Sequence, residues 1–249
     1  MRVGVVSDTH NDLAAIDASV ALFSRRKCEH LIHMGDVSDA KALFHFAPAL
    51  THMGFCWIPG NHDDFDELKP FSDALGATCA SHDGDAQGHV RIGGVDFGMR
   101  HSTYSSPIPE WCRREKFDYV LYGHTHYFNL RFPSNRSRTV VLNPGGFYSG
   151  TEPWTVCVID LAVRSVEVYT FIKPTHRFSL ALSISLDDRL ISHGPGFGEF
   201  SKQVCLLRKC RPRFWCDNRH LFDDEDSWIP VSALSRDNRA QRIQEQRRR

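Results

Sequence analysis

Four short apolar runs, each ending abruptly in a cluster of polar residues, constrain this chain more than any other feature. The runs and their clusters are RVGVV before SDTHND, HLIHM before GDVSD, FCWI before PGNHDD, and DYVLY before GHTH. Helical periodicity follows the first three, and we predict helices from Asn11 or Asp12 to the basic cluster at residues 25–27, over residues 39–46 and over residues 65–75. This alternation predicts a mostly parallel sheet with helices against its faces.

After Gly88 the pattern changes to pairs of short runs with turn residues between them. HVRI and VDFGM flank a Gly-Gly pair, NLRF and TVVLN flank residues 133–137, and WTVCVID precedes SVEVYTF. Such pairs are typical of hairpins, so we predict an α/β fold, a two-sheet α/β sandwich, over residues 1–172. Residues 173–249 are predicted to form an irregular or partly disordered C-terminal extension, in which RFSLALSISL could add one more strand.

The polar clusters bring metal-capable side chains to the strand ends, and ligands of open α/β sheets gather outside the carboxyl ends of the strands. On an extended backbone residues i and i+2 point the same way, which would pair the members of D-x-H and of H-x-H. Each residue alone could be a helix cap, a turn residue or a core residue. Together the four clusters predict a metal centre built from Asp8, His10, Asp36, Asn61, His62, Asp63, His124 and His126.

The series D-x-H, G-D, G-N-H-D and G-H-x-H resembles the calcineurin-like metallophosphoesterase family, above all its small single-domain bacterial and archaeal phosphodiesterases. Those proteins also begin with S-D-T-H and carry a late N-P-G, here at residues 143–145. The resemblance covers residues 1–172 and implies a site for two metal ions. It assigns one metal to Asp8, His10 and His126, the second to Asn61, His101 and His124, and a bridging role to Asp36.

His101 belongs to an incomplete motif. The family usually has T-H-G-H at this strand end, whereas this chain has Arg100, His101, Ser102 and Thr103. We retain His101 as a ligand because it follows the apolar run VDFGM at the position that the second metal requires. The missing Gly-His puts in question any substrate contact that the second histidine would make.

The chemistry implied by the resemblance is hydrolysis of phosphate esters. The mixed set of carboxylates, imidazoles and an amide suits two divalent ions, Mn²⁺ first, with Fe, Zn²⁺, Ni²⁺ and Co²⁺ as alternatives, better than it suits Ca²⁺. Two such ions would share a hydroxide that attacks phosphorus in line. His62 is predicted to be the general acid for the leaving oxygen. Asp63 is predicted either to orient the His62 ring or to cap the next helix.

The complete ligand set and His62 favour an enzyme, most of all a phosphodiesterase acting on a small phosphate ester. The alternative is a catalytically silent scaffold or interaction subunit, like the metallophosphoesterase-like subunit of the retromer coat. Nucleic acid is a less favoured partner, because the chain has no groove-reading motif beyond a basic end at Arg247 to Arg249. A homo-oligomer is compatible with the sequence. Single cysteines in apolar stretches, and no run of about 18 apolar residues, predict a cytoplasmic protein that does not enter a membrane.

Overall fold

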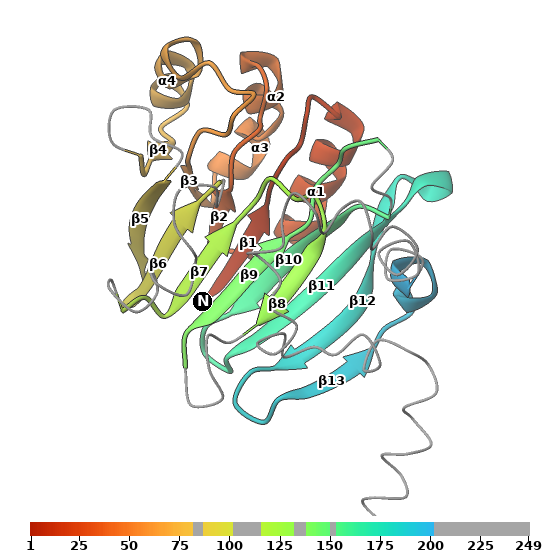
Figure 1. The fold of residues 1–249 in the computed structure, drawn as a ribbon. Helices are drawn as coiled ribbons and strands as arrows, with labels where there is room; N and C mark the ends of the chain where they lie inside the picture. Colours follow the sequence, from red (N-terminus) through yellow and green to blue (C-terminus); the bar gives the residue numbers. More distant parts are fainter. Residues whose placement is uncertain (82–86, 102–115, 132–137, 150–152, 202–249) are drawn as a thin grey trace, which may run out of the picture.

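Two β-sheets face each other in the computed structural model, which describes residues 1–81, 87–101, 116–131, 138–149 and 153–201. Within these ranges the larger sheet has the strand order β13-β12-β11-β10-β1-β2-β3-β4. The smaller sheet has the order β5-β6-β7-β9-β8 (Figure 1). The predicted fold class, an α/β sandwich of two sheets, is confirmed.

The first half of the larger sheet is parallel. It consists of β1 (Arg2–Val6), β2 (His30–His33), β3 (Gly54–Trp57) and β4 (Thr78–Cys79). Val6 lies opposite His33, and His33 lies opposite Trp57. The carboxyl ends of β1, β2 and β3 therefore reach the same edge of the sheet, where their polar loops begin.

Helices connect these strands, as the periodicity predicts. They are α1 (Leu13–Arg25), α2 (Ala40–His45), α3 (Ala47–Leu50) and α4 (Phe65–Ala74). The carboxylates of Asp12 and Asp39 accept hydrogen bonds from the backbone N–H groups of Ala15 and Ala42 and so cap α1 and α2. The predicted helices after Asp12, at residues 39–46 and at residues 65–75 are confirmed.

The smaller sheet is mixed rather than built from hairpins alone. Its strands are β5 (Gln87–Ile92), β6 (Val95–Arg100), β7 (Tyr119–Tyr122), β8 (Phe128–Arg131) and β9 (Val140–Pro144). β5 and β6 form the predicted hairpin, and β8 and β9 pair antiparallel. β7, however, runs parallel to both of its neighbours, β6 and β9. The carboxyl ends of β6 and β7 therefore also lie at one edge.

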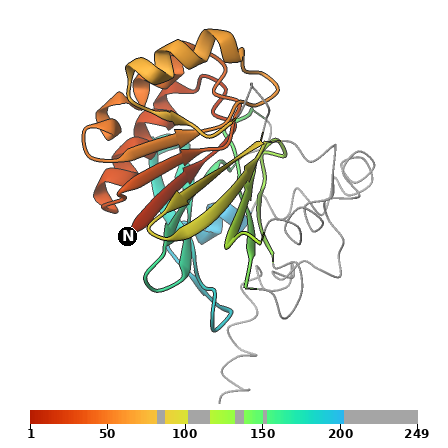
Figure 2. The same cartoon turned by 90° about the vertical axis from the view of Figure 1, so that its left-hand side faces the viewer.

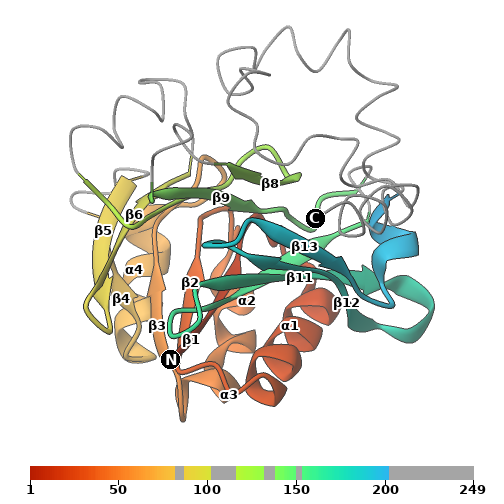
Figure 3. The same ribbon diagram turned by 90° about the horizontal axis from the view of Figure 1, so that it is seen from below.

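Two apolar cores explain why the central strands read as continuous apolar runs. Val5 and Ile32 point between the sheets and pack in one cluster with Leu121. Their neighbours along the strands, Val6 and Leu31, point the other way into the cluster formed with the helices. Both faces of these strands are buried, so polar alternation is absent. Helices α1 to α4 cover one face of the larger sheet and the smaller sheet covers the other (Figure 2; Figure 3).

The larger sheet continues past residue 172, where the sequence predicts the domain to end. After β10 (Thr155–Asp160), β11 (Ser165–Ile172) and the short 3-10 helix η1 (Lys173–Thr175) come β12 (Arg177–Ser185) and β13 (Leu190–His193). Both pair antiparallel within the sheet. Thus 177–193, part of the extension predicted to be irregular, forms strands, one of them at the optional strand RFSLALSISL. Residues 202–249 lie outside the described ranges.

A β-bulge explains why this strand is hard to recognise. The register with β11 shifts between Val168 and Tyr169, so that Ala181 is an extra residue on β12. Phe178 packs on the helix side of the sheet, whereas Leu182 packs between the sheets. A strand whose apolar side chains change face midway has no single periodic signature.

No helix in the described ranges is long and apolar enough to cross a membrane. The cysteines at positions 28, 56, 79 and 157 carry free thiols, and three of them, Cys28, Cys56 and Cys157, are buried. Burial raises the pKa of the Cys56 thiol to about 12, which leaves it protonated and unreactive at neutral pH.

Candidate metal centre

Five strand ends, from both sheets, deliver the candidate site residues. The loop after β1 carries Asp8 and His10, and the loop after β2 carries Asp36. Asn61, His62 and Asp63 follow β3, while His101 follows β6 directly and His124 and His126 follow β7. The structure thus gathers every residue of the predicted site at one edge of the sandwich, where the carboxyl ends of these strands meet.

The loop backbones are left-handed rather than extended, and here the geometric reasoning from sequence is wrong. Asp8 and His10 have φ of 51° and 41°, and His124 and His126 have φ of 71° and 61°. Left-handed φ is uncommon for residues other than glycine, although asparagine, aspartate and histidine adopt it more often than most, and it clusters at functional sites where surrounding structure holds it in place. Main-chain hydrogen bonds supply that restraint, since Asp8 N donates to Gly35 O over 2.9 Å and His10 N to Asp36 O over 3.1 Å. The side chains converge through tight turning, not through strand alternation.

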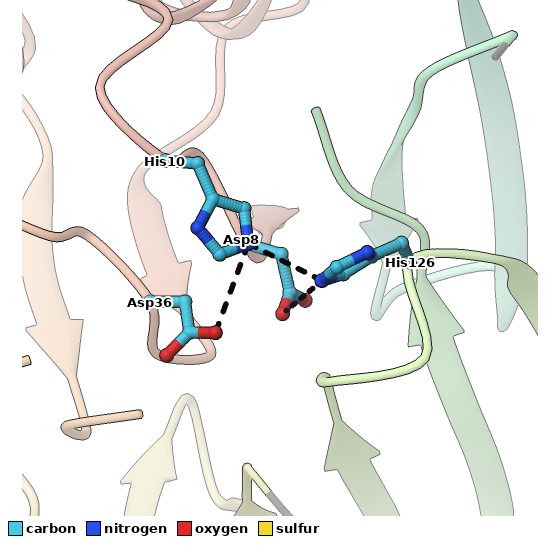
Figure 4. A group of neighbouring side chains, drawn as sticks. All are labelled: Asp8, His10, Asp36 and His126. Atoms are coloured by element: carbon cyan, nitrogen blue, oxygen red, sulfur yellow. Dashed lines mark hydrogen bonds and ion pairs between the residues drawn. The ribbon is translucent and has the colours of Figure 1, made fainter. Parts of the chain in front are cut away.

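The first ligand group consists of Asp8, His10, Asp36 and His126 (Figure 4). One potential ligand atom from each lies within 4.8 Å of those of the others. His126 Nε2 lies 3.3 Å from Asp8 Oδ1 and 3.2 Å from His10 Nε2. His10 Nε2 lies 3.7 Å from Asp36 Oδ2. Two carboxylates and two imidazoles directed at one point form a donor set suited to a divalent transition metal.

The second ligand group shares Asp36 with the first and adds His101 and His124. His101 Nε2 lies 3.3 Å from Asp36 Oδ2. Asn61 belongs to this group by its contacts, because its Oδ1 lies 2.8 Å from His124 Nδ1 and 3.1 Å from His101 Nε2. The seven side chains predicted as ligands therefore fall into two groups joined by one carboxylate.

Neighbouring groups orient the carboxylates and His101. The Nδ1–H of His101 donates to Met34 O over 2.6 Å, which leaves Nε2 facing the ligand group. Asp8 accepts from the backbone N–H of His124 and from the Ser7 hydroxyl. Asp36 Oδ1 accepts from the backbone N–H of His62 over 2.9 Å. These bonds leave the atoms that face the two groups available for a cation.

The two buried carboxylates, Asp8 and Asp36, favour positive charge in the centre. Burial by itself would raise the pKa of Asp8 and of Asp36, but the adjacent His101 keeps the pKa of both carboxyls below the ordinary value. Burial lowers the pKa of His101, yet Asp8 and Asp36 outweigh it and raise that pKa to about 9. Asp36 Oδ2 is buried and makes no well-directed hydrogen bond among the described residues, although His101 Nε2 lies 3.3 Å away. A divalent cation would satisfy this oxygen and compensate both carboxylates, so the residues fit a metal.

His62 and Asp63 lie beside the ligand groups and have different surroundings. His62 is exposed, and its ring centroid lies 5.5 Å from that of His10. Asp63 is largely enclosed, and its two oxygens accept from the backbone N–H groups of Ser38 and Gly60, each over 2.7 Å. The next helix is capped by Asp64, so the prediction that Asp63 caps it is wrong. Asp63 instead ties the loop after β2 to the loop after β3.

His33 is a residue of this centre that sequence reasoning missed. It is fully buried at the end of β2, where its Nδ1 accepts from Gly35 N–H over 3.1 Å and its Nε2 lies 3.1 Å from Thr9 Oγ1. Burial lowers the pKa of His33 to about 3, so the ring is neutral and Nε2–H donates to Thr9. His33 thereby joins the loop of Asp8 and His10 to the loop of Asp36. The only sequence signal was a second histidine in the run HLIHM.

Comparisons with known proteins agree with this geometry. A family model described as the calcineurin-like phosphoesterase superfamily domain matches residues 1–164. Phosphodiesterase MJ0936 of Methanocaldococcus jannaschii is 26% identical over 164 residues, which cover 64% of this chain and 93% of that protein. The solved structure of an archaeal phosphodiesterase aligns with a TM-score of 0.59 at 22% identity and covers 68% of this chain and 99% of its own. Zinc-bound Vps29 from Entamoeba histolytica aligns with a TM-score of 0.50 at 14% identity, covering 75% and 99%.

Proposed function

The chain belongs to the calcineurin-like phosphoesterase superfamily, and from that premise we propose that it is a phosphodiesterase that depends on two divalent metal ions. Its substrate would be a small phosphate ester, and its native metal Mn²⁺. One metal would be held by Asp8, His10 and His126, the second by Asn61, His101 and His124, with Asp36 shared between them.

The position of Asp36 is the observation that carries this proposal. Its carboxylate is common to both ligand groups, and its buried Oδ2 has no hydrogen bond in the described part of the chain. The imidazole nitrogens of His101 and His10 lie 3.3 Å and 3.7 Å from this oxygen, and a divalent cation held among them would compensate the buried carboxylate. A single structural ion pair would not need two histidine-containing groups that share one carboxylate, with His10 Nε2 and His101 Nε2 both near Asp36 Oδ2.

Two bound divalent ions would polarise the phosphoryl oxygens and lower the pKa of a water that attacks phosphorus. The residues of the chain would hold the metal ligands in position and supply the proton for the leaving oxygen. His101 is held by Met34 O with Nε2 toward the second ligand group. His62 is exposed next to His10 and outside both groups, so its ring is free to donate a proton to the leaving oxygen. Asp63, in our proposal, acts by holding the loop that carries His62.

Metal removal and replacement test the proposal. We expect the full-length protein, stripped with a chelator and dialysed, to be inactive toward bis-p-nitrophenyl phosphate and to regain activity with Mn²⁺. The variant Asp36→Asn should bind metal more weakly at both positions, which calorimetric titration measures directly. Glu167→Gln, in the ion pair with Arg26, is the matched control for loss of a carboxylate elsewhere in the sheet. Hydrolysis that persists without metal would contradict the mechanism.

A catalytically silent scaffold is the second candidate, because Vps29 shares this fold. Structural likeness at such low identity concerns the fold alone. The same experiment separates the two candidates, since a scaffold can bind two equivalents of metal without hydrolysing the diester. No turnover with Mn²⁺, Ni²⁺ or Co²⁺ in a protein shown by calorimetry to hold metal would favour the scaffold.

We also propose that residues 1–172 contain all of the catalytic machinery and that the protein works in the reducing environment of the cytoplasm. The site residues named above all precede residue 127. The free thiols of Cys28, Cys56, Cys79 and Cys157 support a reducing compartment.

A further inference from the structure

An exposed tyrosine borders the first ligand group. The ring centroid of Tyr148 lies 5.0 Å from that of His126 and 5.4 Å from that of His10. Tyr148 is 50% exposed, whereas the two imidazoles that it contacts are half-buried. Part of the ring rests on the imidazoles, and about half of the side chain faces solvent beside the ligand group.

The backbone on either side of Tyr148 is firmly attached to the centre. Phe147 is buried in the helix-side core, and its N–H donates to Asp8 O over 2.9 Å. Gly146 approaches Asp8 so closely that an added Cβ would lie 2.7 Å from the Asp8 Cβ. The carbonyl of Tyr148 accepts from Trp154 Nε1 over 2.9 Å. The backbone that carries the Tyr148 ring is therefore held against Asp8 by the fold.

We propose that Tyr148 forms one wall of a subsite for a planar aromatic group carried by the substrate, such as a nucleobase or an aryl ester. The inference rests on the proposed function, because it requires a phosphoryl group at the ligand groups of Asp8, His10, Asp36 and His126. A ring beside that point can stack on a planar substituent of the same ester, and stacking recovers the apolar surface that the free protein exposes. The site would thus prefer aromatic phosphodiesters to aliphatic ones.

The test compares two phosphonates that differ only in an aromatic ring. Binding of phenylphosphonate and methylphosphonate to the metal-loaded full-length protein would be measured by calorimetry, which does not require turnover. We expect the wild type to favour the phenyl compound by about tenfold, the scale of one aromatic contact. Tyr148→Phe should keep this ratio, because it keeps the ring. Tyr148→Leu, which removes the ring, should reduce the ratio toward one.

Val163→Ala serves as the control for an exposed apolar side chain, because Val163 is 66% exposed in the turn after β10, at the opposite edge of the sheet. Val163→Ala should keep the preference for the phenyl compound.

A second pair of compounds, thymidine 5′-phosphate and deoxyribose 5-phosphate, distinguishes a nucleobase from a simple aryl group. A preference that depends on Tyr148 in either pair supports the subsite. Equal ratios in the wild type and Tyr148→Leu for both pairs of compounds, or no binding of any of these compounds by the metal-loaded wild type, would overturn the inference. Hydrolysis of bis-p-nitrophenyl phosphate by the same sample tests the proposed function separately.

Discussion

Replacing Gly60 with alanine should disable the metal centre while leaving the fold intact. Gly60 lies in the turn after β3, against the loop that carries Asp36. An added Cβ would lie 2.1 Å from Asp36 Oδ1 and 2.3 Å from the Asp36 backbone nitrogen. Ordinary van der Waals contact begins at 3.4 Å. Because the obstructing atoms include main chain, a change of rotamer cannot relieve the overlap, and the two loops must separate by roughly 1 Å.

This displacement acts on the carboxylate that both ligand groups share. Misplacement of a catalytic group by about 1 Å can reduce the rate by about 10²-fold. We therefore expect Gly60→Ala to lower kcat/KM for bis-p-nitrophenyl phosphate by about that factor at saturating Mn²⁺. Weaker Mn²⁺ binding in calorimetry should accompany the loss, since the hydrogen bond from His62 N–H to Asp36 Oδ1 would also be strained.

The control is Gly76→Ala, after α4. Gly76 has φ of +71°, and nothing lies within 4 Å of an added Cβ. Left-handed strain should cost it about 1 kcal/mol of stability, measured by urea denaturation, with no change in kcat/KM or Mn²⁺ affinity. A folded Gly60→Ala protein with wild-type kcat/KM and metal affinity would refute the reasoning that contact between these loops sets the geometry of the centre.

Three further predictions address other parts of the molecule. His62→Ala should slow hydrolysis of an alkyl diester, a poor leaving group, by about 10²-fold and hydrolysis of the p-nitrophenyl ester much less; equal effects in steady-state kinetics would exclude the acid role. His33 is neutral in the folded state, since burial lowers its pKa from 6.5 to about 3, so the unfolded chain binds the extra proton as pH falls below 6.5. The free energy of unfolding of the metal-free protein should thus decrease from pH 7 to pH 5 more steeply in the wild type than in His33→Gln, and parallel urea-denaturation curves would contradict this. A chain that ends at residue 172 should have a lower Tm than one that ends at residue 201, because it loses β12, which pairs with the edge of β11 and adds Phe178 and Leu182 to the two cores; equal Tm values would show that β12 adds no stability.

The strands, the helices and the identity of the candidate ligands could be predicted from sequence because each depends on local chemistry. Apolar runs buried on both faces must form central strands, and Asp12 and Asp39 stand where a helix needs a cap. Asp8 and His124 stand where parallel strands must end in loops. His101 could be placed despite its broken motif, because the apolar strand before it sets where it emerges.

The tertiary structure alone decided how these residues meet. Pairing between separate loops holds Asp8 and His10 in left-handed conformations, and no local pattern encodes such long-range restraint. The role of Asp63 likewise depends on amides from two loops. His33 and Tyr148 act through contacts with residues distant in sequence, so periodicity does not reveal their roles. Sequence therefore determined which groups reach the edge of the sheets, whereas packing between loops determined their direction, because side-chain direction depends on backbone conformation that distant hydrogen bonds impose.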